Sequence, residues 1–197
     1  IKSLRDCLVA IGFQIMKQNQ IRVFVVARGI LIAGFAVNAE ESVLRGCRGT
    51  YDNEPRLANG RVDCQKLLAE LTELRANTYN WLVWHKATDW EDLKIFLPLA
   101  RKNKINVWVT IVPPTESSPN YADSEPFKQN YLKWAEEIGK LSAQEKNLVA
   151  WSIDDFMSNQ KTFTPDALGQ MLKQAHASNP KLAFVPCIYF RDVTPEF

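Results

Sequence analysis

The alternation of two kinds of segment constrains the fold of this chain most. Short runs rich in β-branched and aromatic residues are each followed by a longer segment with apolar residues at helical spacing. The strand-like runs cover 78–85, 105–112, 147–154 and 182–190, with a shorter candidate inside 42–53. The helix-like segments cover 61–77, 89–104, 126–144 and 164–180. Because the strand-like runs are apolar on both faces, the order predicts an α/β fold with parallel strands covered by helices.

Residues at the expected helix ends support these boundaries. Asp89 can cap the second helix, and Pro126 suits the first position of the third. Thr164, with Pro165 behind it, predicts the start of the fourth.

Two architectures fit a β-α-β-α order: an open doubly wound sheet and a (β/α)8 TIM barrel. No strand is followed by a Gly-rich phosphate loop, which favours the barrel. A full barrel needs roughly 250 residues. We therefore expect the 197 residues to hold about the first five β/α units of a TIM barrel, as a piece of a longer protein.

Residues 16–39 have the pattern of a secretory signal peptide, with residues 1–15 expected to lie upstream of its start. Basic residues between 17 and 28 precede an apolar run from Gly29 to Val37, and Ala39 completes a site of small residues suited to signal peptidase. The alternative, a membrane-spanning helix, requires a longer apolar run. The sequence predicts a secreted or periplasmic protein without a stable membrane anchor, whose mature domain is 40–197.

The charge of that mature domain bears on its partners. Residues 40–197 hold 19 basic and 21 acidic residues, a net charge of −2. Binding to nucleic acid requires clustered Lys and Arg, so this balance argues against it.

Cysteine and histidine give no signal for a metal or cofactor. Cys47, Cys64 and Cys187 lie at no metal-site spacing, and we expect small buried residues, with one disulfide as the alternative. The two histidines, His85 and His176, show no metal-binding pattern either.

Polar and aromatic residues follow several of the expected strands. In a barrel, chemistry is located where the strands end, and such groups can stack on a sugar or bond its hydroxyls. These residues are Tyr51, Asp52, Asn53, Trp84, His85, Lys86, Thr110, Asp154, Asp155, Tyr189 and Arg191.

The pair Asp154–Asp155, in "LVAWSIDDFMSN" (148–159), is the sharpest of these features. Two adjacent carboxylates repel each other when both are ionised, which favours a protonated one as proton donor. Glycoside hydrolysis requires such a general acid. The alternative is a structural one, since Asp at a strand end also caps turns.

Four stretches, in the same order, resemble the catalytic barrel of glycoside hydrolase family 84, the β-N-acetylglucosaminidases that include O-GlcNAc hydrolases. The resemblance spans roughly residues 45–190. The stretches are "RGTYDNEP" (48–55), "ANTYNWLVWHKATDW" (76–90), "VAWSIDDF" (149–156) and "FVPCIYF" (184–190).

This resemblance implies roles for individual residues. The acetamido group of the substrate would be the nucleophile, with Asp154 orienting that group and Asp155 as general acid/base. Lys86 would contact a sugar hydroxyl, and Gly49 would align with the sugar-binding turn of the first strand. The chain departs from the family in "GTYDN", where the family has Gly-Phe-Tyr-Gly, and in an acid placed three residues after Lys86.

The combined reading is a secreted glycoside hydrolase that cleaves N-acetylhexosaminides by a substrate-assisted, retaining mechanism without a cofactor. Tyr51, Trp84 and Tyr189 join Lys86 and Gly49 as expected substrate contacts. Two alternatives remain: a retaining glycosidase with a carboxylate nucleophile, and a non-catalytic carbohydrate-binding TIM barrel.

Overall fold

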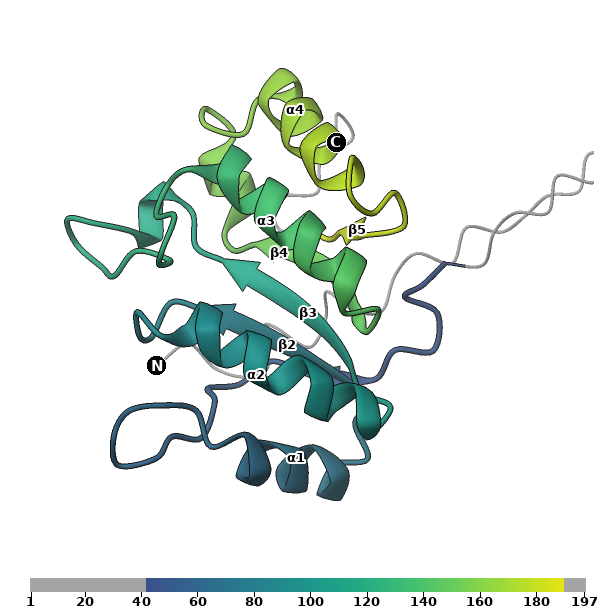
Figure 1. Cartoon of the computed structure of the whole chain (residues 1–197). Helices are drawn as coiled ribbons and strands as arrows, with labels where there is room; N and C mark the ends of the chain where they lie inside the picture. Colours follow the sequence, from purple (N-terminus) through teal and green to yellow (C-terminus); the bar gives the residue numbers. More distant parts are fainter. Residues whose placement is uncertain (1–41, 190–197) are drawn as a thin grey trace, which may run out of the picture. The chain divides into compact units, whose positions relative to one another are not determined.

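The computed structural model describes residues 42–189, so the signal-peptide prediction and Arg191 lie outside the described part (Figure 1). Strands and helices alternate along this part as expected. Its strands are β1 (Gly49–Thr50), β2 (Thr78–Val83), β3 (Asn106–Ile111), β4 (Leu148–Ile153) and β5 (Ala183–Phe184). Its α-helices are α1 (Cys64–Glu73), α2 (Asp89–Lys102), α3 (Tyr131–Gln144) and α4 (Pro165–His176). Two 3-10 helices, η1 (Pro114–Glu116) and η2 (Phe156–Asn159), follow β3 and β4.

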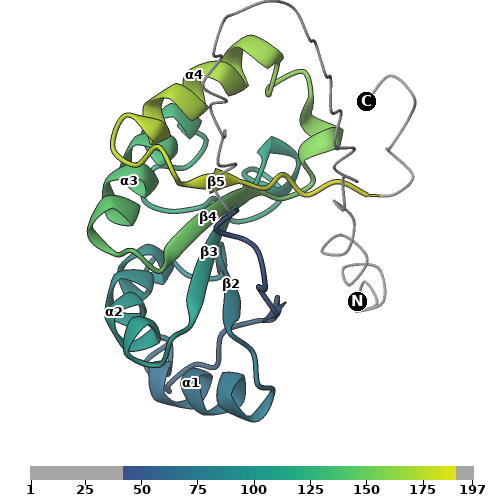
Figure 2. The same ribbon diagram turned by 90° about the vertical axis from the view of Figure 1, so that its right-hand side faces the viewer.

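The strands form one parallel sheet in the order β1-β2-β3-β4-β5. Each strand therefore pairs with the next one in sequence, and every crossover moves in the same direction. The four described helices lie on one face of the sheet (Figure 2). This arrangement confirms the predicted α/β fold with a parallel sheet and is compatible with a partial α/β barrel.

The core lies between the helices and this face of the sheet. Alternate side chains of the three central strands enter it, among them Trp81 of β2, Val109 of β3 and Trp151 of β4. Edge-to-face ring contacts join the helices around it; the Trp90 and Trp134 rings are 5.1 Å apart.

The opposite face of the sheet is more polar. Thr110 of β3 donates a hydrogen bond from its hydroxyl to Oδ1 of Asn80 in β2 at 2.6 Å. Ser152 of β4 pairs with Thr110 in the strand register, and Asp154 comes two residues later. Alternation along β4 therefore carries the polar face to the end of the strand.

The fifth strand is shorter than its expected range because of a proline. Pro186 has no N–H and cannot donate to the ladder. Backbone pairing with β4 continues on both sides of it, from Val185 N to Trp151 O (2.9 Å) and from Cys187 N to Ile153 O (3.2 Å). The segment after β5 therefore stays beside β4 as far as the strand ends.

Two expected helix starts are wrong, and one is confirmed. Helix α3 begins at Tyr131 rather than at Pro126, because the Asn130 side chain caps it by accepting from Lys133 N at 3.1 Å. Asp89 is the first residue of α2 rather than its cap. Thr164 caps α4 as predicted, accepting from Ala167 N at 3.2 Å.

Within residues 42–189, no helix combines the length and the apolar character needed to cross a bilayer.

Helices α3 and α4 approach each other closely at a glycine. A Cβ on Gly139 would lie 2.5 Å from the carbonyl oxygen of Ala175, closer than atoms can pack. Gly169, in α4, has open space around the same position.

We therefore predict opposite effects for the same substitution at these two glycines. Gly139→Ala should lower the free energy of unfolding by about 1–3 kcal/mol, because α3 and α4 must move apart. Gly169→Ala, the matched control, should raise it by about 0.5–1 kcal/mol, because alanine is the better helix former. Urea unfolding of the two variants measures both effects. Equal stabilities would contradict the close helix approach.

Candidate functional site at the carboxyl end of the sheet

The central strands end in register, which brings their following residues to one edge. Val83, Ile111 and Ile153 are partners across β2, β3 and β4. The next residue after β4 is Asp154, whose N–H donates to Ile111 O at 3.0 Å. We call the residues that follow the strands at this edge the rim.

Asp154 is held at both of its carboxylate oxygens. The Tyr51 hydroxyl, just after β1, donates to Oδ2 at 3.1 Å. The backbone N–H of Asp155 donates to Oδ1 at 2.9 Å. A residue following β1 thus reaches a residue following β4, and the carboxylate of Asp154 has a fixed orientation.

Asp155 has an uncommon backbone conformation, with φ 39° and ψ 38°, in the left-handed region. Asp tolerates this region better than most non-glycine residues, and Arg75, Lys104 and Lys128 of the described residues also have positive φ. The buried side chain of Asn159 supports the conformation by donating to Asp155 O at 2.9 Å. The Tyr189 hydroxyl, which follows β5, donates to Oδ1 of Asp155.

Two groups next to these carboxylates, the Cys187 thiol and the Tyr189 hydroxyl, have raised pKa values. Burial, followed by the charge of Asp154 and a hydrogen bond with it, raises the pKa of the Cys187 thiol to about 12. Burial and the hydrogen bond with Asp155 raise the pKa of Tyr189 above its ordinary value. Tyr189 therefore stays protonated and remains a hydrogen-bond donor to Asp155 at neutral pH.

The other expected contact residues differ in their placement. Trp84 is half-buried on the rim, one residue past β2, and Lys86 is exposed on the loop that follows. Gly49 pairs with Thr78, the first residue of β2, so it lies at the amino end of the sheet, away from Asp154. A Cβ there would meet the Thr78 carbonyl oxygen at 3.0 Å, so the glycine permits close strand pairing.

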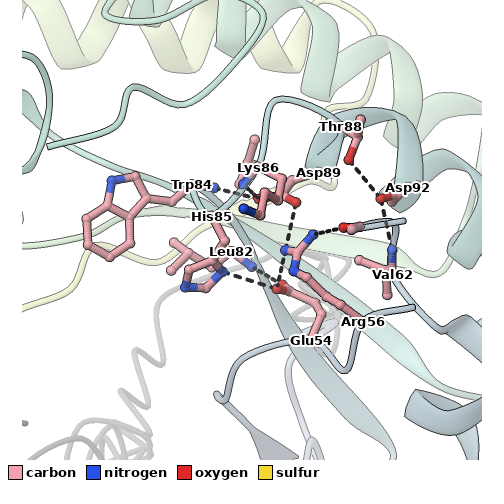
Figure 3. A network of polar contacts seen from close by, with 12 residues as sticks. Glu54, Arg56, Val62, Leu82, Trp84, His85, Lys86, Thr88, Asp89 and Asp92 are labelled. Atoms are coloured by element: carbon pink, nitrogen blue, oxygen red, sulfur yellow. Dashed lines mark hydrogen bonds and ion pairs between the residues drawn. The ribbon is translucent and has the colours of Figure 1, made fainter. Parts of the chain in front are cut away.

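A buried ion-pair network, which sequence reasoning missed, fixes the rim beside β2 (Figure 3). The side chains of Glu54 and Asp89 are 0% exposed, and Arg56 Nη2 lies 3.3 Å from Glu54 Oε2 and 2.8 Å from Asp89 Oδ1. Asp89 Oδ2 also accepts from the backbone N–H groups of Trp84 (3.1 Å) and Lys86 (2.9 Å). The carboxylate expected to cap α2 instead fixes the loop that carries Trp84 and Lys86.

Glu54 joins this network to His85. Its Oε1 accepts from Leu82 N at 3.2 Å, and its Oε2 lies 3.2 Å from His85 Nδ1. Nearby, Asp92 accepts from Val62 N (3.1 Å) and pairs with Arg61 (2.5 Å), which holds the loop before α1 against α2. The signal in the sequence was weak, because Glu54 and Arg56 lie in a loop without periodicity.

The described residues contain no group of three or more His, Cys, Asp or Glu side chains arranged to hold a metal ion. Cys47, Cys64 and Cys187 are free thiols in this part of the chain. The rim carries two carboxylates, two tyrosine hydroxyls, the His85 imidazole, the Lys86 amine and neighbouring aromatic rings.

The ion-pair network predicts a large stability cost when its cation is removed. Arg56→Met keeps the length of the side chain but leaves the Glu54 and Asp89 carboxylates buried beside each other. We expect a loss of about 3–5 kcal/mol in the free energy of unfolding. Lys66→Met, at an exposed pair with Glu70, should cost less than about 1 kcal/mol. Urea unfolding compares the two, and similar costs would contradict a buried network.

The raised pKa of Cys187 predicts slow alkylation that depends on Asp154. Asp154→Asn removes the negative charge that disfavours the thiolate, so labelling by iodoacetamide at pH 9 should speed up. Lowering a pKa by one gives about ten times more thiolate at a given pH. Peptide mass spectrometry follows Cys187 separately from the other thiols. Asp166→Asn, at the exposed start of α4, is the control, and an equal rate in both variants would contradict the prediction.

The sequence matches no protein-family model, and a search of curated proteins finds no significant match.

Proposed function

We propose that the chain belongs to a TIM-barrel glycoside hydrolase that cleaves N-acetylhexosaminides, with Asp154 and Asp155 as its catalytic carboxylates. The observation that carries the proposal is the hydrogen bonding of these two carboxylates. Each carboxylate accepts a hydrogen bond from a tyrosine that follows a different strand, Tyr51 for Asp154 and Tyr189 for Asp155. Residues distant in the sequence thus converge on two adjacent acids at one rim, more than a turn-capping Asp requires.

The strand order supports the barrel part of the proposal. A doubly wound sheet reverses its direction at a switch point and has helices on both faces. The sheet here keeps one direction over five strands, with the described helices on one face. Further β/α units added beyond β5 in the same sense would close such a sheet into a barrel.

The two acids suit different roles. Asp154, held at both oxygens, has a fixed orientation in which it can accept a hydrogen bond from the acetamido N–H of the substrate and stabilise the charge that develops on that group. Asp155 would donate its proton to the glycosidic oxygen as the bond to the anomeric carbon breaks.

The reaction proceeds in two steps. In the first, the acetamido carbonyl oxygen attacks the anomeric carbon and forms an oxazoline-type ring, while the protonated alcohol leaves. In the second, the Asp155 carboxylate takes a proton from water, which attacks the same carbon and reopens the ring. Two inversions retain the configuration.

The test expresses the complete reading frame and assays an aryl N-acetyl-β-glucosaminide beside the corresponding glucoside. Asp155→Asn should lower kcat by about 10²–10⁴-fold, and Asp154→Asn by about 10²–10³-fold. Asn tolerates the left-handed conformation, so the backbone at residue 155 is unchanged. Asp166→Asn, on the exposed surface, should keep the wild-type rate.

The alternatives give different results in the same assay. Substrates with a trifluoroacetyl group have a weaker carbonyl nucleophile, so their hydrolysis should be much slower. Equal rates for acetyl and trifluoroacetyl substrates, or efficient cleavage of the glucoside, would indicate a carboxylate nucleophile instead. Saturable sugar binding without turnover would favour a non-catalytic carbohydrate-binding barrel.

A further inference from the structure

We propose that His85, oriented by the buried carboxylate of Glu54, is a second sugar-binding group of the rim, which bonds a hydroxyl of an oligosaccharide that packs on Trp84. This inference rests on the proposed function in one respect, that the rim binds carbohydrate. It adds a binding position that neither the Asp154–Asp155 pair nor the family resemblance includes.

The hydrogen bonds of Glu54 determine the orientation of the imidazole. Glu54 accepts from Leu82 N and lies against the Arg56 guanidinium, so its carboxylate acts as an acceptor. Nδ1 of His85 is then the donor to Oε2, which leaves Nε2 as the ring nitrogen for another partner. The His85 side chain is 25% exposed, whereas that of Glu54 is 0% exposed. A buried acid thus holds an accessible imidazole.

The contact with Glu54 gives His85 more than a packing role. Glu54 and Asp89 are both fully buried and share one guanidinium, that of Arg56. Besides Arg56, the imidazole of His85 also contacts Glu54. A residue needed only to fill space at this position would not have to be a base.

An aromatic surface lies next to this imidazole. The Trp84 ring is 5.7 Å from that of His85 and 6.3 Å from that of Tyr121, which is 57% exposed. Trp84 Nε1 donates to Ala122 O at 2.8 Å, which fixes the indole to the loop that follows β3. Figure 3 shows the indole projecting away from the ion-pair network. A fixed aromatic face beside an oriented hydrogen-bonding group is a suitable site for a sugar ring.

The register gives the separation from the catalytic pair. Trp84 and Asp154 each follow the last residue of strands that are two apart in the sheet. Two strand spacings correspond to about 10 Å. A sugar on Trp84 would therefore neighbour the sugar whose bond is cleaved, and the chemical class of ligand is an oligosaccharide of at least two units.

The two histidines of the chain allow a residue-resolved test. The complete protein is labelled with ¹⁵N-histidine, and His85→Gln and His176→Gln each identify one imidazole by the loss of its signals. Addition of a trisaccharide of N-acetylglucosamine, or of glucose, should shift the Nε2 resonance of His85 in a saturable manner. The resonances of His176, whose Nε2 lies 2.9 Å from Leu182 O in a different part of the fold, should stay in place. An unmoved His85 signal with both sugars overturns the proposal.

Variants separate positioning by Glu54 from a general structural role. Glu54→Gln should change the ¹⁵N shifts of His85 in the absence of sugar. It should also lower the affinity for the trisaccharide by about tenfold, because the imidazole loses its anionic partner. His85→Gln should lower this affinity to a similar degree. If circular dichroism shows that Glu54→Gln is unfolded, His85→Gln alone tests the proposal. His176→Gln is the matched control with wild-type affinity. Wild-type affinity in His85→Gln overturns the proposal.

This readout requires no turnover, so the two proposals fail separately. A saturable His85 shift in a protein that hydrolyses no glycoside supports the binding position and overturns the proposed hydrolysis. Hydrolysis that depends on Asp155, with an unmoved His85, overturns the binding position alone.

Discussion

The in-order parallel pairing of the strands is the constraint on which the rest of the structure depends. Because each strand lies beside its sequence neighbour, the described helices cover one face and the carboxyl ends of all the strands point to one edge. Short polar segments after each strand then meet without any long-range motif in the sequence. Tyr51 and Asp154 are 103 residues apart, yet they share a hydrogen bond at this edge.

The rim is held by two different kinds of interaction. On the β4 side, neutral tyrosine hydroxyls and the Asn159 amide position the aspartates. On the β2 side, an ion-pair network with two buried carboxylates fixes the loops. Buried charges tolerate little displacement, because an unpaired one is costly. The β2 side is therefore a rigid support for the loop that carries Trp84 and Lys86.

Much of the fold could be predicted from periodicity, and the misses have physical causes. The runs that became β2, β3 and β4 were found to within two residues, because buried parallel strands are continuously apolar. Pro126 was mistaken for a helix start because Asn130, four residues on, supplies the cap that the chain uses. Asp89 was mistaken for a cap because its partner Arg56 lies 33 residues away, which no local pattern reveals.

The residues of the candidate site could likewise be predicted from the sequence only in part. Asp154 and Asp155 could be found from the sequence, because two acids after an apolar strand break its pattern. Tyr51 and Tyr189 were expected as contacts of a sugar, and the structure shows that each one bonds an aspartate. Glu54 and His85 could not be paired from sequence, since both lie in loops and their contact depends on the register of β1 and β2. Gly49 was placed by alignment of a short motif, and its position at the amino end of the sheet reflects strand packing.

The left-handed backbone conformation at residue 155 limits which side chains are favourable at this position. Gly, Asn and Asp adopt this conformation at low cost. Of these three, aspartate alone carries an exchangeable acidic proton. Drift at this position under selection for folding alone would therefore lead to Asn or Gly, which preserve the turn and remove the acid. An aspartate kept at position 155 among natural variants of this chain would therefore support the proposed role of this residue as an acid, whereas Asn or Gly there would speak against it.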